Sequence, residues 1–271
     1  MAARRGFKGA LGSRWYTVVS EDFESALRFR HRQFTRMKFP LFQQLWLRGS
    51  DVFGPLNEMR TENLGRTWSG PVEHEATLGL RKEPNGVTVG ACDFWPKWHV
   101  DSGKLLGIGH TVRYIGGAVM KSRPRETSYA VYDPQARTWT AWKTMAMPPE
   151  ARFFNNGAGS VQRVDLANGE ILLPFYFQSK GQTDYRTAVA RCVFDGTTLA
   201  VREIGGELAQ VSGRGLYEPS LAQAGGRFFF TMRNDATACV TSSRDGLHFD
   251  APRRWTWDDG TDLGSYNTQA H

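Results

Sequence analysis

Three charged residues occupy positions from which they could do chemistry. Glu218 and Arg233 bracket a glycine hairpin, and Asp51 lies in a short loop rich in glycine and proline, residues 49–55. A carboxylate can hold or remove a proton, and a planar guanidinium binds another carboxylate through two parallel hydrogen bonds. These residue types suit acid–base chemistry on an anionic substrate. A lone Asp in such a loop is more often a turn residue, so the spacing alone leaves both interpretations of Asp51 open.

Other polar residues lie at the ends of apolar strands. Cys92 with Asp93, and His110, could line a cleft where inner strands meet. His110 is equally consistent with a hydrogen-bonded structural histidine. Arg163 lies within a segment that begins with a Gly-rich run, residues 157–174, and is a further candidate for contact with a substrate.

Metal and nucleotide sites are not indicated. The six histidines show no paired ligand spacing, and the three cysteines are far apart with no CxxC motif, which favours buried thiols. The sequence also lacks a Walker loop, and the Gly-Ile-Gly run at Gly107–Gly109 is followed by no helical pattern. We therefore expect neither a metal nor a cofactor.

A turn motif recurs along the chain, and it indicates the fold. Residues 61–68 and 243–249 each place a hydroxyl residue, then Asn or Asp, then Gly, then an aromatic at nearly fixed offsets, and residues 133–139 form a degenerate third copy. The Asx side chain can accept hydrogen bonds from nearby backbone N–H groups, and Gly supplies a positive φ.

A second type of turn alternates with the first. Gly103, Gly169 and Gly226 each lie in a hairpin turn followed by an apolar strand, at an interval close to that of a four-stranded blade. Short apolar runs broken by turn residues from about Leu41 onward indicate an all-β domain. A β-sandwich is the alternative, but it does not predict the alternation, so we expect a β-propeller.

Charge is concentrated at one end of the chain. Residues 1–48 hold ten basic and three acidic residues, which accounts for the whole net charge of +7. We expect a basic N-terminal arm, residues 1–40, followed by a propeller over residues 41–271. The neutral body argues against nucleic acid as a partner. No apolar run is long enough to span a membrane, no secretory signal is visible, and no obligate protein partner is evident.

Together these motifs resemble the sialidase-like β-propellers, in which the repeated turn is the Asp box. The resemblance covers residues 41–271 and implies six blades in the full protein, with four or five present here and the chain ending before the last. It implies that Asp51 is the acid/base, that Glu218 activates a tyrosine nucleophile, and that Arg233 holds the substrate carboxylate, with His110 and Arg163 as further contacts. The arginine of the family's first strand is replaced by Lys38, and its nucleophilic tyrosine falls beyond the end of this sequence.

The expected function is therefore that of an exo-acting glycoside hydrolase of sialidase type. Its substrates would be sialylated or related acidic glycans, and it would need no metal or cofactor. The alternative is a propeller that binds glycans without turnover. Relatives of this kind usually work outside the cytoplasm, in the periplasm or as secreted proteins, although the sequence itself shows no export signal.

Overall fold

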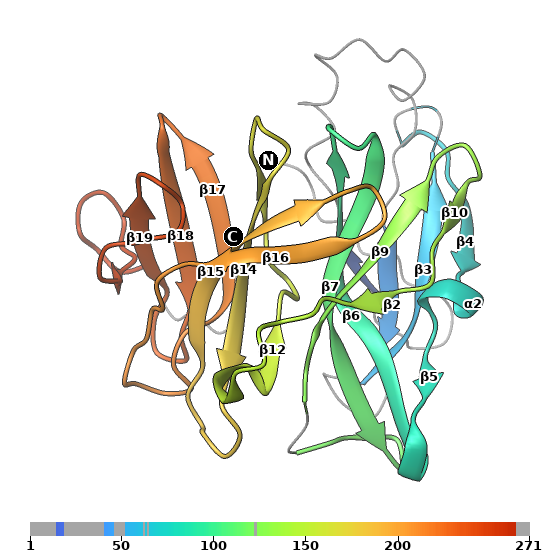
Figure 1. Ribbon diagram of the computed structural model, residues 1–271, viewed down its shortest axis with the longest axis horizontal. Coiled ribbons are helices and arrows are strands. Elements are labelled where there is room, and N and C mark those ends of the chain that lie inside the picture. The colour runs from blue at the N-terminus through green and yellow to red at the C-terminus, as the bar shows by residue number, and fades with distance from the viewer. Residues whose placement is uncertain are drawn as a thin grey trace.

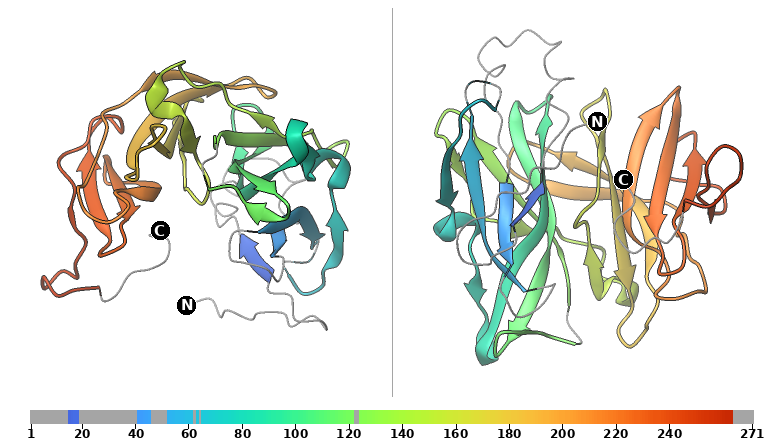
Figure 2. Two further views of the ribbon diagram at one scale, coloured as in Figure 1. Left: turned by 90° about the horizontal axis from the view of Figure 1, so that it is seen from below. Right: turned by 180° about the vertical axis from the view of Figure 1, so that it is seen from behind.

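The protein folds into four antiparallel β-sheets arranged side by side around an open arc, as the computed structural model shows (Figures 1 and 2). The structure describes residues 15–18, 41–45, 52–61, 63, 65–121 and 124–263. We call the four sheets blades 1 to 4 in chain order. Helical structure in these residues is limited to α2 (Glu75–Leu78) and the 3-10 turns η1 (Pro84–Gly86) and η2 (Ala151–Phe153). The all-β propeller predicted from the sequence is confirmed.

Each blade has its strands in chain order, with short additional strands at the edges of blades 2 and 3. Blade 1 contains β1 (Trp15–Val18), β2 (Leu41–Leu45), β3 (Phe53–Arg60) and β4 (Ser69–Glu73). Blade 2 contains β5 (Arg81–Lys82), β6 (Val87–His99), β7 (Lys104–Ile115), β8 (Ala118–Val119), β9 (Thr127–Asp133), β10 (Thr138–Trp139) and β11 (Lys143–Thr144). Blade 3 contains β12 (Asn155–Gly157), β13 (Val164–Asp165), β14 (Ile171–Gln178), β15 (Arg186–Phe194) and β16 (Leu199–Ile204). Blade 4 contains β17 (Tyr217–Ala224), β18 (Arg227–Arg233), β19 (Cys239–Ser243) and β20 (Arg253–Arg254).

Blade 1 includes β1, which lies within residues 1–40, the segment predicted to be an N-terminal arm. Residues of β1 pair with β2, from Trp15 opposite Gln44 to Val18 opposite Leu41. Residues 19–40 of the expected arm, Lys38 among them, lie outside the described residues. None of the helices in the part of the chain that the structure describes is long and apolar enough to cross a membrane.

An Asx turn lies in the corresponding connection of every blade. These connections join β3 to β4, β9 to β10, β15 to β16 and β19 to β20. Asn63 Oδ1 accepts the N–H of Thr67 between β3 and β4, and Asp245 Oδ1 accepts the N–H groups of Leu247 and His248 between β19 and β20. Asp133 and Asp195 accept equivalent backbone bonds in blades 2 and 3. Blade 3 therefore has a turn of this kind that the sequence pattern did not reveal.

The glycine hairpins join β6 to β7, β13 to β14 and β17 to β18. Gly103, Gly169 and Gly226 have φ values of 61°, 80° and 75°, the left-handed conformation that glycine adopts without a steric penalty. Two kinds of turn thus alternate along the chain, as the sequence predicts.

The core consists of apolar layers between successive blades. One cluster joins Leu56 of blade 1 to Phe94 and Trp139 of blade 2. The next joins blade 2 to blade 3, and β14 contributes Leu173 to it while Leu172 faces the cluster shared with blade 4. Strand β14 is buried on both faces, which explains its almost continuous apolar sequence. This packing fixes the blades relative to one another.

Candidate functional site

Glu218 and Arg233 form an ion pair at one end of blade 4. Glu218 lies at the start of β17 and Arg233 at the end of β18, and Arg233 Nη1 donates to Glu218 Oε2 at 2.8 Å. Their side chains are 19% and 18% exposed, so the pair is accessible but largely shielded. The structure therefore brings together the two residues that the sequence had paired.

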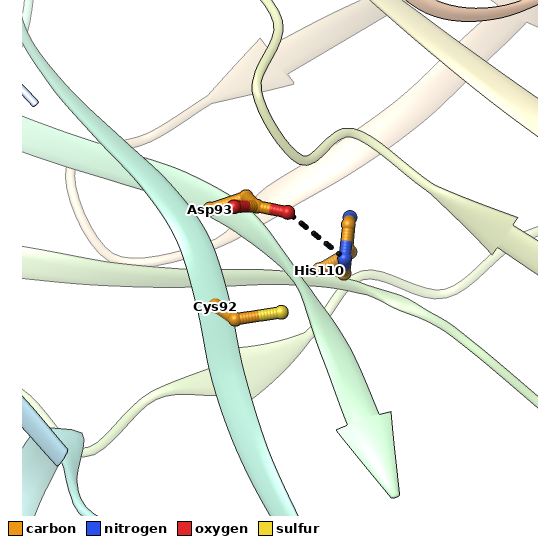
Figure 3. Close-up of side chains that lie close together, drawn as sticks. All are labelled: Cys92, Asp93 and His110. Carbon is orange, nitrogen blue, oxygen red and sulfur yellow. Dashed lines mark ion pairs between the residues drawn. The ribbon is translucent and has the colours of Figure 1, made fainter. Parts of the chain in front are cut away.

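A second pair, of a carboxylate with a histidine, lies at the corresponding place in blade 2. Asp93 on β6 and His110 on β7 approach to 3.4 Å between Oδ2 and Nε2 (Figure 3). In blade 2, Cys92 is opposite His110, and in blade 4, Tyr217 is opposite Arg233. The carboxylate follows immediately in each case, so the two pairs occupy equivalent positions of their sheets.

Both carboxylates are positioned by a β-bulge. The register of β6 shifts between Cys92 and Trp95, and that of β17 shifts between Tyr217 and Ser220. Asp93 and Glu218 have φ values of 49° and 47°, a left-handed conformation that is uncommon outside glycine. A bulge redirects a side chain and is common next to active sites. Backbone strain of this kind clusters at functional sites, so the two bulges support a functional role for the carboxylates.

Blade 3 places a tyrosine between these pairs. The ring of Tyr176, on β14, lies 6.2 Å from that of His110 and 6.5 Å from that of Tyr217. Its phenol interacts electrostatically with both Glu218 and Asp93, and burial raises its pKa well above the ordinary value. Tyr176 is therefore a neutral phenol that connects the polar residues of blades 2 and 4.

The Gly-rich segment before β13 packs directly on His110. A Cβ added to Gly159 would lie 1.9 Å from His110 Nδ1, and one added to Gly157 would lie 2.7 Å from His110 Cβ. Only glycine at these two positions lets blade 3 approach the histidine so closely. Ser160 N–H also donates to the backbone carbonyl of Asp93 at 3.1 Å, which ties the segment to the bulge.

Tyr217 belongs to a supporting network behind Glu218. Its hydroxyl donates to Asp235 Oδ1 at 2.7 Å and accepts from Arg214 Nη2 at 2.6 Å. Burial, together with the bond to Asp235, raises the pKa of Tyr217 to about 12. The guanidinium carbon of Arg233 lies 5.0 Å from the centre of the Tyr217 ring. Tyr217 thus supports Arg233 through its ring.

Arg163 has a different environment from the one predicted. It is 3% exposed, and its Nη1 and Nη2 donate to the backbone carbonyls of Leu106 and Lys97 while Nε donates to Asp165. All three nitrogens therefore bond within the protein, and they join blade 2 to blade 3. This geometry gives Arg163 a structural role and does not support the predicted contact with substrate.

Asp51, the predicted acid/base, lies outside the described residues, and its prediction stays untested. Its neighbour Val52 is buried against Tyr114 and Cys92. Cys92 in turn adjoins the Asp93–His110 pair.

Cys92, Asp93 and His110 also have the composition of a metal site. One ligand atom from each lies within 4.8 Å of the others (Figure 3). The buried guanidinium of Arg125, however, interacts electrostatically with both Cys92 and Asp93. A positive charge beside the cluster disfavours a bound cation, and the cluster is organised as an ion pair next to a buried thiol.

Arg125 and Tyr176, which lie beside the cluster of Cys92, Asp93 and His110, were not identified from the sequence. Arg125 follows a proline in a connection with no motif, and Tyr176 is embedded in an apolar strand. The one signal for Tyr176 is that it is the only hydroxyl residue in Ile171–Gln178.

Taken together, the four blades and their polar cluster define a β-propeller of sialidase-like fold. No family model matches the sequence, and no curated protein matches it. Solved structures do. A Hadza microbial sialidase superposes with a TM-score of 0.55 at 15% identity, covering 86% of this chain and 45% of that one. Trypanosoma rangeli sialidase in complex with sialic acid gives a TM-score of 0.54 at 14% identity, covering 79% of this chain and 35% of that one.

A third similar structure comes from another class of carbohydrate-active enzyme. A β-1,3-galactosidase of glycoside hydrolase family 43 gives a TM-score of 0.52 at 10% identity, covering 83% of this chain and 74% of that one. At these identities the likeness concerns the fold. This chain spans less than half the length of the two sialidases that it matches.

Proposed function

We propose that this chain is part of an exo-acting glycoside hydrolase of sialidase type that acts on sialylated or related acidic glycans. The observation that carries the proposal is the Glu218–Arg233 ion pair, a carboxylate and a guanidinium held 2.8 Å apart on adjacent strands of blade 4. The sialidase-like fold supports it, and so does the equivalent pair in blade 2. If Arg233 or His110 turned from its carboxylate partner toward a ligand carboxylate, it would exchange one polar interaction for another of the same kind.

The proposed roles follow from the chemistry of an anionic sugar. Arg233 would bind the substrate carboxylate, and Glu218 would serve as the base that removes a proton from a phenol nucleophile. Asp51 would protonate the leaving oxygen and then activate water. Tyr217 and Tyr176 are poor candidates for the nucleophile, since the first hydroxyl is held by Asp235 and Arg214 and the second by Arg125.

A glycan-binding propeller without turnover is the second candidate. The observation that favours it is the same ion pair, because Arg233 already neutralises the carboxylate that would have to act as a base.

A substrate panel separates the two functions. The complete protein to which this chain belongs is incubated with the 4-methylumbelliferyl glycosides of N-acetylneuraminic acid and of galactose, and both fluorophore release and sugar binding are measured. The hydrolase proposal predicts release from the acidic glycoside and little from the neutral one. Binding of the acidic glycoside with no release at any enzyme concentration would support the binding propeller instead.

A further inference from the structure

Arg214 is a second arginine beside the Glu218–Arg233 pair, in the loop between β16 and β17. Its guanidinium carbon lies 4.6 Å from the centre of the Tyr217 ring, and that of Arg233 lies 5.0 Å from the same ring. Arg214 also interacts electrostatically with Glu218. Glu218 therefore has two cations near it, its partner Arg233 and Arg214.

Arg214 is held by a carboxylate of its own, that of Asp235. Arg214 Nε donates to Asp235 Oδ1 at 3.0 Å, Nη2 donates to the same oxygen at 2.6 Å, and the backbone N–H donates to Oδ2 at 2.8 Å. The hydrogen bonds from Arg214 and from the Tyr217 hydroxyl hold the pKa of Asp235 well below its usual range. Asp235 is therefore ionised at neutral pH and neutralises Arg214.

Other hydrogen bonds fix the backbone around Arg214. Asn234 is fully buried, and its Nδ2 donates to the carbonyl groups of Ser212 and Gly215 at 2.8 Å each. The N–H of Tyr185, the residue before β15, donates to the carbonyl of Arg214 at 2.7 Å. These bonds would keep Arg214 beside the ion pair even if its carboxylate partner lost its charge. The charge of that partner can therefore be tested separately from the conformation of the loop.

A second unneutralised cation would change the chemistry of Glu218. A nearby opposite charge favours the ionised form of a carboxyl group, and a carboxylate stabilised in this way removes a proton less readily. Without a carboxylate to bind, the Arg214 guanidinium would be attracted to Glu218 and would compete with Arg233 for it. Tyr176 also acts on Glu218 electrostatically, but burial raises the pKa of this phenol, so it adds no charge at neutral pH.

We propose that Asp235 is a positioning residue for Glu218: by binding Arg214, it keeps this second guanidinium from pairing with Glu218, which stays with Arg233. The role of Glu218 as a base rests on the proposed function. The competition of two carboxylates, Asp235 and Glu218, for one guanidinium does not depend on any activity.

The first test is the pH profile of kcat/KM for 4-methylumbelliferyl sialoside, measured with the complete protein to which this chain belongs. Asp235→Asn keeps the shape of the side chain and removes its charge. We expect the acidic limb of the profile to move to lower pH by about one unit, and kcat at neutral pH to fall about tenfold without a rise in KM. A purely structural role for Asp235 predicts the opposite, a higher KM and an unmoved limb, and that result would overturn the inference.

Removal of the cation provides the second test. Asp235→Asn combined with Arg214→Gln should return the limb and kcat to within about twofold of wild type, because the competing guanidinium is gone. Arg214→Gln alone leaves Asp235 without its cation and should move the limb to higher pH, so it carries the test if Asp235→Asn does not fold. Asp262→Asn is the matched control. It breaks another exposed pair of blade 4, with Arg254, and should leave the profile unchanged. A loss in Asp235→Asn that Arg214→Gln does not restore would contradict the proposed role.

A titration without substrate separates this inference from the proposed function. Glutamate carboxyl carbons of the complete protein are labelled with carbon-13, and the Glu218 signal is assigned by its absence in Glu218→Gln. We expect the midpoint of its NMR titration to fall by about one pH unit in Asp235→Asn and to return when Arg214→Gln is added. That result in a protein that hydrolyses no sialoside would remove the hydrolase function and keep the inference. An unmoved midpoint in a protein that does hydrolyse the sialoside would overturn the inference alone.

Discussion

Asp93 and Glu218 are equivalent residues of two different blades. Each is the first residue of a β-bulge on the first long strand of its sheet, each has a left-handed backbone, and each pairs with a basic side chain on the next strand. The propeller has therefore built the same arrangement of a carboxylate and a basic side chain twice. The two pairs differ in the basic group, which is an imidazole in blade 2 and a guanidinium in blade 4. Figure 2 shows the two sheets on either side of blade 3. Tyr176 of blade 3 interacts electrostatically with both carboxylates.

Gly159 should be the glycine least tolerant of a side chain near the site. A methyl group there would lie 1.9 Å from a buried histidine ring, so Gly159→Ala should lower the free energy of unfolding by about 1–3 kcal/mol through overpacking. Urea unfolding measures this, and the NMR shifts of the His110 ring report its displacement. Gly206→Ala is the control, since its nearest neighbouring atom would be 3.9 Å away. A Gly159→Ala chain as stable as the control, with unchanged His110 shifts, would contradict the packing described.

Cys192 should make the fold sensitive to alkaline pH. Burial raises the pKa of this thiol from 9.0 to about 12, so the folded state retains the proton more tightly than the unfolded state. The stability associated with this group is fully present below pH 9 and is lost as the pH rises through 12. The loss is on the order of 4 kcal/mol.

Chemical denaturation at a series of pH values from 8 to 12 checks this prediction. Cys192→Ala should be less stable than wild type at pH 8, because of the cavity, but its stability should decline less steeply. Identical pH dependence in the two chains would show that another group is responsible.

Arg163 should affect stability and not recognition. Arg163→Gln removes one partner of a buried ion pair and leaves Asp165 without its cation, which typically costs about 3–5 kcal/mol. Equilibrium unfolding should show this loss, whereas the exposed Arg202→Gln should change stability by less than about 0.5 kcal/mol. The structural role would be wrong if Arg163→Gln kept wild-type stability and instead weakened binding of an acidic glycan.

The fold could be predicted because its signals are local. An Asx turn requires an acceptor side chain two or more residues before the backbone N–H groups that it binds, and a hairpin glycine supplies a positive φ, so Asp245 and Gly226 indicate their turns without any tertiary information. Asp195 was missed because its turn lacks the aromatic that completes the motif in the other copies. The strand β1 within residues 15–18 was missed because its partner, β2, is distant in sequence.

The site was only partly predictable, because its geometry depends on contacts between blades. Glu218 and Arg233 lie on adjacent strands joined by a hairpin, so their approach follows from local pairing. Arg125 and Tyr176 meet only because blades 2 and 3 pack together, and no spacing in the sequence records that packing. Arg163 illustrates the converse. Its position in a Gly-rich segment suggested an accessible side chain, but the neighbouring blade supplies carbonyl groups that bind it.

The most direct test of the proposed function is the effect of Glu218 on sialoside hydrolysis. kcat/KM for 4-methylumbelliferyl sialoside is measured for the complete protein to which this chain belongs, as wild type, as Glu218→Gln and as Glu203→Gln, whose side chain is 49% exposed on blade 3. A role as general base predicts that Glu218→Gln loses about 10²- to 10⁴-fold in kcat/KM while remaining folded, and that Glu203→Gln does not. Wild-type turnover by a folded Glu218→Gln chain would contradict the account.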